Sequence, residues 1–165
     1  MTRQYHGYAM NLESALAEFT PKIGAEIHVS PWTTITQERI DQFADATGDH
    51  QWIHVDPERA RAESPFGATI AHGYLVLSLY PSLRGHDGRN TPPFPGVTRT
   101  INYGVNRVRF PSPVRAGARL RGRFEIVGAA ERNGALQVVE RFTVELDSGD
   151  KPACVAEVVR LLYFD

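Results

Sequence analysis

In the first third of the chain, apolar side chains recur three and four positions apart, which is the spacing of one helix face. Residues 11–19 and 36–47 both show this spacing. Thr36 is a suitable N-cap for the second segment, and Gly48 is suited to end it. Asp56, followed by proline and an acidic residue, marks a further helix start. The pattern therefore predicts three short helices in this part of the chain.

Residues 72–83 are almost wholly apolar, so a helix here would be apolar on every side. Such a helix must be buried, and it is shorter than the roughly 20 residues that a membrane-spanning helix needs. Residues 85–96 are rich in proline and glycine and predict a loop. We therefore expect one buried core helix followed by a loop.

Most of the remaining chain alternates β-branched or aromatic residues with polar ones, which predicts strands. Asn133-Gly134 is a strong hairpin signal because both residue types tolerate positive φ. Residues 25–35 also have the composition of a strand, with Pro31 at an edge or a bend. The long strands are expected over residues 97–110, 118–127, 135–146 and 153–163.

The order of these elements is typical of an α+β fold, in which the buried helix lies against one face of an antiparallel sheet. With 165 residues the chain fits a single domain, 1–165, in which residues 1–20 form an N-terminal extension with a short helix. A sheet of this kind has exposed edges, so we expect a dimer.

Composition narrows the possible partners and the compartment. The formal net charge of -1 at pH 7 gives no reason to expect a nucleic acid or a membrane as partner. Cys154 is the only cysteine, which excludes an intrachain disulfide. Residues 1–10 lack the apolar core of a signal peptide. We therefore expect a reduced, cytoplasmic protein.

The stretch 47–56 carries the densest chemistry, with an acid and a histidine just after the end of a helix. Asp49 and His54 can meet if the chain between them turns, and a carboxylate beside an imidazole suits general acid–base chemistry on one water. The structural alternative makes Asp49 a turn residue and His54 a hydrogen-bonded core histidine. His50 and His54, next to acidic residues, also leave a metal site open. Spacing alone does not decide between these hypotheses.

A second candidate lies at residues 70–73, where a loop meets the apolar helix. The first N–H groups of a helix have no partner within it and favour negative charge. The N–H of Gly73 can therefore stabilise a thioester oxygen that becomes enolate-like, and a glycine lets a substrate approach the backbone closely. The alternative is that Gly73 only relieves packing.

These segments together resemble a known family, the MaoC-like hydratases and dehydratases, which includes the (R)-specific enoyl-CoA hydratases. Residues 47–54 resemble its hydratase signature, with Gln51-Trp52 where Asn-Pro is frequent. Ala71-His72-Gly73 at the start of an apolar helix, and the stretch 102–114, are also similar to it. The resemblance covers about residues 20–163.

The resemblance implies a hot-dog fold, in which a curved antiparallel sheet wraps around a long central helix, and a homodimer. It implies that Asp49 and His54 hold and activate a water, one taking its proton while the other protonates the α-carbon of an acyl thioester. The backbone N–H of Gly73 would polarise the thioester carbonyl. No metal or redox cofactor is implied, and coenzyme A enters only as part of an acyl-CoA substrate.

Four further residues are candidates for binding. Arg107 and Arg109 share a strand parity, so they would point to the same face and meet the phosphates of coenzyme A. His72 is a candidate for orienting the active-site loop, and Asn102 for a hydrogen bond to that loop. The arginines that alternate along the second long strand are instead expected on a solvated sheet face.

We therefore hypothesise a lyase that reversibly hydrates trans-2-enoyl-CoA to (R)-3-hydroxyacyl-CoA. A dehydratase acting on acyl groups linked to an acyl-carrier protein would use the same chemistry. A hot-dog thioesterase and a non-catalytic acyl-CoA-binding subunit are further alternatives. The presence of Asp49, His54 and Gly73 together argues against the non-catalytic subunit.

Overall fold

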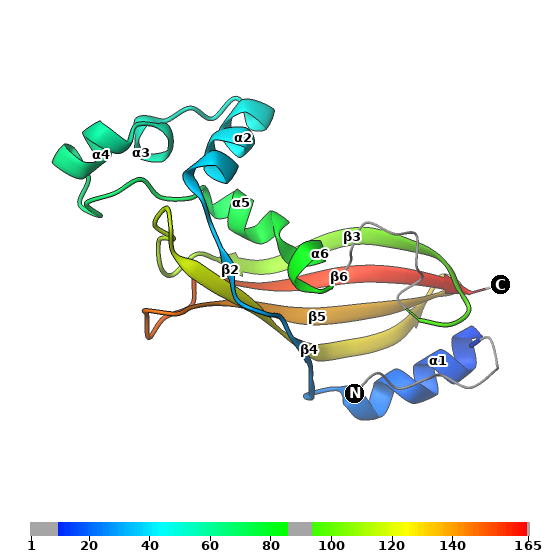
Figure 1. Cartoon of the computed structure of the whole chain (residues 1–165). Helices are drawn as coiled ribbons and strands as arrows, with labels where there is room; N and C mark the ends of the chain where they lie inside the picture. The colour runs from blue at the N-terminus through cyan, green and yellow to red at the C-terminus, as the bar shows by residue number, and fades with distance from the viewer. Residues whose placement is uncertain (1–9, 86–93, 165) are drawn as a thin grey trace.

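Six antiparallel strands form one sheet in the computed structural model, which describes residues 10–85 and 94–164. The sheet order is β1-β4-β5-β6-β3, and β2 also pairs with β4 (Figure 1). The strands are β1 (Glu26–Val29), β2 (Thr33–Thr34), β3 (Val97–Arg109), β4 (Arg119–Arg132), β5 (Ala135–Leu146) and β6 (Cys154–Phe164). All four long strands lie where the alternation predicts them.

Alternation decides which face of each strand is buried. In β4, Leu120 and Phe124 are buried, whereas Arg121 between them is partly exposed. The β4–β5 hairpin turns at Asn133 and Gly134, whose φ angles of 50° and 77° are both positive. The turn residues predicted from the sequence therefore make the tight turn that this geometry requires.

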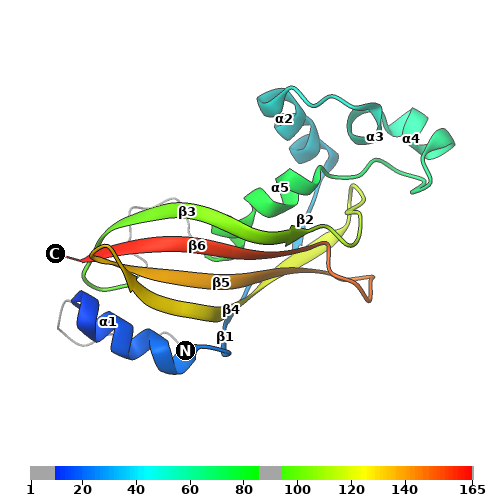
Figure 2. The same ribbon diagram turned by 180° about the vertical axis from the view of Figure 1, so that it is seen from behind.

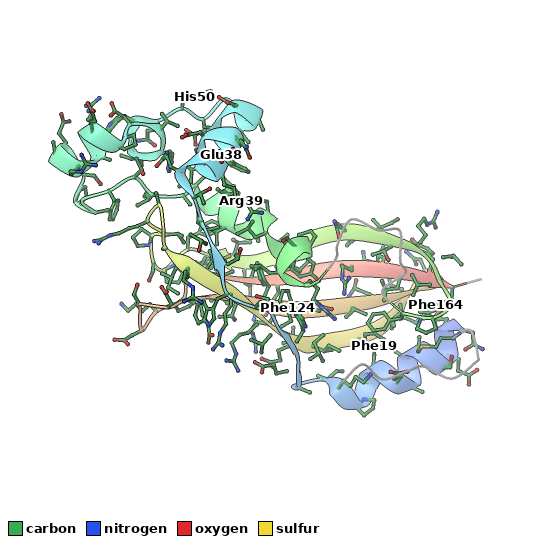
Figure 3. All side chains as sticks on the ribbon, in the orientation of Figure 1. Phe19, Glu38, Arg39, His50, Phe124 and Phe164 are labelled. Carbon is green, nitrogen blue, oxygen red and sulfur yellow. The ribbon has the colours of Figure 1, made fainter. Side chains whose placement is uncertain are left out.

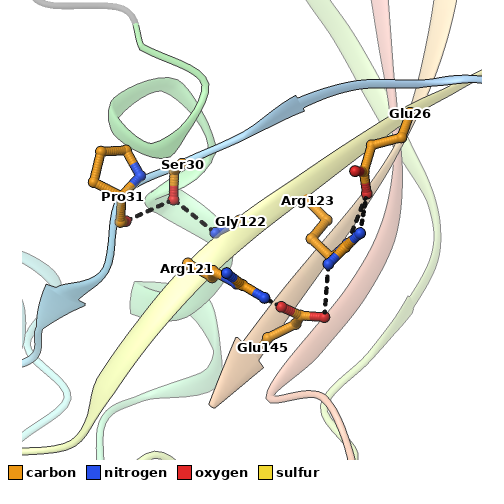
Figure 4. A network of polar contacts seen from close by, with 7 residues as sticks. All are labelled: Glu26, Ser30, Pro31, Arg121, Gly122, Arg123 and Glu145. Atoms are coloured by element: carbon orange, nitrogen blue, oxygen red, sulfur yellow. Dashed lines mark hydrogen bonds and ion pairs between the residues drawn. The ribbon is translucent and has the colours of Figure 1, made fainter. Parts of the chain in front are cut away.

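The outer face of the sheet carries ion pairs, as expected for the arginines of β4. Arg121 Nε donates to Glu145 at 2.7 Å, and Arg123 Nε donates to Glu26 at 2.6 Å (Figure 4). All four side chains are about one third exposed or more. Pairs this exposed contribute little stability, so this face is a solvated surface.

The strand predicted over 25–35 is interrupted, and β1 and β2 pair separately with β4. The Ser30 hydroxyl donates to the Pro31 carbonyl and accepts from the Gly122 N–H, both at 2.9 Å (Figure 4). Because proline has no N–H to give to a ladder, the bend falls at Pro31, as the sequence suggests.

The helices begin and end at the predicted signals. Thr36 caps α2, Gly48 ends it at a φ of 77°, and Asp56 caps α4. Asn11 starts the first helix with a reciprocal capping box to Ser14. One helical turn, α3, was not predicted. The helices are α1 (Leu12–Phe19), the 3-10 helix η1 (Thr20–Lys22), α2 (Gln37–Thr47), α3 (Trp52–Val55), α4 (Pro57–Glu63), α5 (Gly73–Ser78) and α6 (Tyr80–Leu83).

The core helix predicted over 72–83 is present as two pieces, α5 and α6, separated at Leu79. Pro81 explains the break, because it has no N–H to donate to the carbonyl four residues earlier. The expectation that this helix is buried on every side is wrong for the single chain. Leu75 and Val76 face the core, but Tyr74 is 72% exposed.

The inner face of the sheet is covered at two places. Helices α5 and α6 cover one apolar cluster, to which Phe124 belongs, and α1 covers a second, to which Phe19 belongs (Figure 3). Helices α2, α3 and α4 lie beyond one end of the sheet, far from α1, in both views (Figure 1, Figure 2). This curved sheet with a helix on its inner face is the predicted hot-dog fold of the α+β class.

A buried charged cluster lies between the two apolar clusters. Glu140 is fully buried on β5, between Val138 of one cluster and Phe142 of the other. Its carboxylate accepts hydrogen bonds from three side chains: Tyr80 Oη (2.7 Å), Arg84 Nε (3.1 Å) and Arg160 Nη2 (2.5 Å). Burial alone would raise the pKa of Glu140, but the two guanidinium groups and the hydroxyl outweigh it, and the net pKa is lowered.

No helix within 10–85 or 94–164 combines the length and the apolar composition needed to cross a membrane. Most of the loop predicted over 85–96 falls in 86–93, outside the described residues.

Candidate active site

Asp49 and His54 are placed by the left-handed turn at Gly48. The Gly48 N–H closes α2 on the Ala44 carbonyl, and the chain then turns into α3, which carries His54. The His54 side chain is buried, whereas the Asp49 carboxylate is 57% exposed. The turn that acid–base chemistry requires between these two residues is therefore present.

His54 has one ring nitrogen occupied and the other available. Nδ1 donates to the Ile70 carbonyl at 2.6 Å; because a carbonyl only accepts, the hydrogen of the neutral ring is on Nδ1 and Nε2 holds a lone pair. Burial lowers the pKa of His54, and the neighbouring His72 lowers it further, while the Ile70 carbonyl and Asp49 act in the opposite direction. The net shift is downward and favours the neutral ring, which can accept a proton.

His72 stands next to both residues. Its ring lies nearly parallel to that of His54, with the centroids 3.7 Å apart. Its Nε2 donates to the backbone carbonyl of Asp49 at 2.9 Å and lies 3.9 Å from the Asp49 carboxylate. His72 therefore contacts Asp49 through the backbone carbonyl of that residue and His54 through its own ring.

The three side chains form one cluster, in which one ligand-type atom from each lies within 4.8 Å of the others. Such a group has donors that suit a divalent metal as well as a water. The predicted metal alternative is different, since it paired His54 with His50. His50 instead bonds Asp45 at 2.9 Å at the outer end of α2, and this bond raises its pKa (Figure 3). That no metal is used stays a prediction.

Gly73 is the first residue of α5. A Cβ at this position would stand 3.0 Å from the ring of Phe110, closer than side chains normally pack. The packing alternative for Gly73 therefore has direct support. It does not exclude the other role, because the N–H of a first helical residue has no partner within the helix.

Gln37 and Thr69 form hydrogen bonds that support the backbone of His54, and neither residue was predicted. The Gln37 amide donates to the His54 carbonyl at 2.7 Å, and the Thr69 hydroxyl donates to the Gln37 side-chain oxygen. Thr69 is buried and lies just before the Ile70 carbonyl that binds His54. No sequence signal marks Gln37, which resembles any polar residue in the first turn of a helix.

Strand parity does not place Arg107 and Arg109, the predicted phosphate contacts, on one face of β3. The pairing of β3 with β6 shifts register between Asn106 and Arg109, and Arg107 has a positive φ of 52°. The two-residue period of a regular strand is therefore broken between these residues, and the parity argument for Arg107 and Arg109 is corrected. Their contact with the phosphates of coenzyme A stays a prediction. Arg107 is 3.5 Å from Glu157, and Arg109 bonds the carbonyl of Val108.

Asn102 lies on β3 opposite Arg160 and lines an open pocket of about 320 Å³ between this strand and the core helix. Among the described residues, no side-chain hydrogen bond joins Asn102 to residues 69–72, so that role stays a prediction. The pocket is mostly apolar and is lined by Leu77, Ser78, Tyr80, Pro81, Asn102, Gly104, Val105 and Val158.

Comparison with known proteins shows which family the chain belongs to. The chain matches the model of the MaoC like domain over residues 18–148. It is 48% identical to 3-hydroxyacyl-thioester dehydratase Z of Mycobacterium tuberculosis, covering 91% of this chain and 97% of that protein. It is 46% identical to nodulation protein N of Rhizobium leguminosarum, covering 93% and 94%.

Among solved structures, it resembles the unliganded R-hydratase PhaJ1 of Pseudomonas aeruginosa, with a TM-score of 0.68 and 25% identity over 87% of this chain and 83% of that one. The family match covers most of the chain, and the similar proteins are matched over most of their own length. The chain therefore belongs to the MaoC-like dehydratase family and is a hydratase or dehydratase of that family.

Proposed function

We propose that this protein reversibly adds water to trans-2-enoyl-CoA and gives (R)-3-hydroxyacyl-CoA. The observation that supports the proposal most directly is the cluster of Asp49, His54 and His72, whose polar atoms lie within 4.8 Å of one another at the start of α5. A carboxylate beside a neutral imidazole with a free lone pair can hold and polarise one water.

In the proposed reaction the water oxygen bonds to the β-carbon of the enoyl group. The electrons of the carbon–carbon double bond move toward the thioester carbonyl, and the α-carbon then takes up a proton. Asp49 and His54 divide the two proton transfers: one accepts the proton of the water and passes it to the other, which donates it to the α-carbon. Both members then return to their starting protonation states, and the reverse sequence is dehydration.

The thioester oxygen gains negative charge during this reaction and needs a donor. The proposed donor is the backbone N–H of Gly73, the first N–H of α5, next to His72 in the chain. The ring of Phe110 packs against the side of Gly73 that a Cβ would occupy, so the ring fixes the position of this backbone.

The apolar pocket along the core helix is the proposed site of the acyl chain. Leu77, in its lining, comes four residues after Gly73, or about 6 Å along α5, and Pro81, also in its lining, follows in α6. The pocket therefore begins one turn beyond the proposed oxyanion donor and continues away from it.

We further propose that the protein is a homodimer. Strand β3 is at the edge of the described sheet, and its side chains are almost all exposed. An edge strand of 13 residues with exposed apolar side chains favours pairing with another chain. The exposed large hydrophobic residues on and beside this edge are Tyr74, Ile101, Tyr103, Val105 and Phe110.

The test follows loss of the enoyl absorbance of crotonyl-CoA and of longer enoyl-CoAs. We expect Asp49→Asn and His54→Ala to lose about 100-fold or more in kcat, the usual size of general acid–base catalysis. His50→Ala is the matched control, because His50 is paired with Asp45 outside the cluster. Wild-type rates no better than those of the Asp49 and His54 variants would refute the proposal.

Further measurements in the same assay distinguish the alternative functions and the metal hypothesis. Activity only with acyl groups on a carrier protein would assign the chain as a carrier-protein dehydratase, and release of free coenzyme A would assign a thioesterase. Full activity after exhaustive chelation would exclude a metal in the cluster, whereas loss that zinc restores would require one.

A further inference from the structure

We propose that His72 is a positioning residue, which sets the placement of Asp49 through a backbone hydrogen bond and of His54 through ring stacking. This inference rests on the proposed function, because it concerns the same water-binding pair. It adds a third side chain that touches both members and is not itself assigned a proton transfer.

The first support is the hydrogen bonding of the His72 side chain. It occupies the N-cap position of α5, but its side chain makes no capping hydrogen bond to that helix. The side chain instead crosses to the loop after α2, where Nε2 donates to the Asp49 carbonyl at 2.9 Å. The bond joins residues 23 positions apart, so its role lies between segments and not within the helix.

The second support is the contact with His54. The two rings are stacked at a centroid distance of 3.7 Å and an angle of 27°. His54 Nδ1 is held by the Ile70 carbonyl, two residues before His72. The His54 ring is thus fixed at its edge by one residue of this loop and on its face by another, so its Nε2 has a single direction.

The third support is the burial of His72. Its side chain is 3% exposed, and Nδ1 has no hydrogen-bond partner among the described residues. Because Nε2 faces a carbonyl and must carry the hydrogen, Nδ1 of the neutral ring is a bare acceptor. A buried, half-satisfied imidazole is costly to keep as mere packing. A role in placing its two neighbours accounts for it.

Two substitutions separate the donor from the ring. His72→Gln keeps an N–H at about the position of Nε2 and removes the stacked ring. His72→Phe keeps the stacked ring and removes the donor. Asn11→Ala removes the N-cap of α1, far from the cluster, and controls for a general loss of stability.

We expect both His72 variants to lower kcat with little change in KM, because displacement of Asp49 by about 1 Å costs up to 100-fold in rate. His72→Gln should exceed His72→Phe in kcat by about fivefold, the factor that one hydrogen bond contributes. Asn11→Ala should melt at a lower temperature with unchanged kcat. Wild-type kcat in both His72 variants, equal losses in the two, or an effect confined to KM would overturn the proposal.

A measurement on the wild-type protein keeps the test open if a variant does not fold. Nitrogen-15 NMR of the imidazoles should show His72 with its hydrogen on Nε2 and His54 with its hydrogen on Nδ1. A His72 hydrogen on Nδ1 would overturn the inference. If instead the wild-type enzyme hydrates no enoyl thioester, the proposed function fails, while the NMR result still reports on the His72 contacts.

Discussion

The buried carboxylate of Glu140 allows a stability prediction to be worked out in detail for the variant Glu140→Gln. This substitution keeps the size of the side chain and removes its charge. One of the two oxygens becomes an NH₂ group, which then faces at least one donor, since Arg160 binds one oxygen and Tyr80 and Arg84 bind the other. Either orientation of the amide therefore breaks part of the cluster.

The expected loss is large because the site is dry. Glu140 is 0% and Arg160 2% exposed, and their atoms are 2.5 Å apart. Removing one partner of a buried ion pair typically costs about 3–5 kcal/mol, because the attraction between the two charges is strong in a low-dielectric environment and is lost with the removed group. Tyr80→Phe is the matched control, since it removes one hydrogen bond to the carboxylate and should cost about 1.5–3 kcal/mol.

The assay is urea unfolding at pH 7 and at a series of lower pH values, with the protein concentration held constant. The folded pKa of Glu140 is lowered, so its contribution is complete above the usual value of 4.5 and is lost as the pH falls through the folded value. The gap between wild type and Glu140→Gln should therefore narrow in acid. A gap below about 1 kcal/mol at pH 7, or one that widens in acid, would refute the reasoning.

Three further predictions concern the site and the assembly. Burial and His72 lower the pKa of His54, and the proposed reaction needs its neutral ring. The acid limb of kcat/KM should therefore have a midpoint below 6.5, and a midpoint above 7 would contradict this. Gly48→Ala should lower the free energy of unfolding by about 1–2 kcal/mol at its φ of 77°, and Gly48→Asn by less, as urea titration will test. Val105→Lys should convert the proposed dimer to a monomer in size-exclusion chromatography with light scattering. Ile23→Lys, at a residue that is exposed elsewhere, should leave the dimer intact. A dimer that is unchanged by Val105→Lys would exclude β3 as the interface.

Local signals in the sequence predict most of the fold. The caps at Thr36 and Asp56, the stop at Gly48 and the turn at Asn133-Gly134 all act within a few residues, and each is confirmed. The alternation that defines the four long strands is equally local. The break at Leu79 is also local in origin, since proline follows two residues later, but the strong apolar pattern obscured it.

The candidate site depends on contacts that no local pattern contains. His54 meets the Ile70 carbonyl 16 residues away, and His72 meets the Asp49 carbonyl 23 residues away. Gln37 reaches the His54 carbonyl across 17 residues and has no distinguishing neighbours. The irregularity around Arg107 lies where β3 shifts register against β6, so the parity of β3 alone does not determine the faces of Arg107 and Arg109.

Helices α3 and α4 have few buried side chains, only His54 and Ala60 among their residues. We expect a segment with so little buried surface to open at a lower free energy than the sheet, as a separate cooperative unit. His54, one member of the proposed water-binding pair, is in α3, whereas Gly73 is in α5, which packs on the sheet. Catalysis is therefore expected to disappear in mild denaturant while the sheet is still protected from amide exchange.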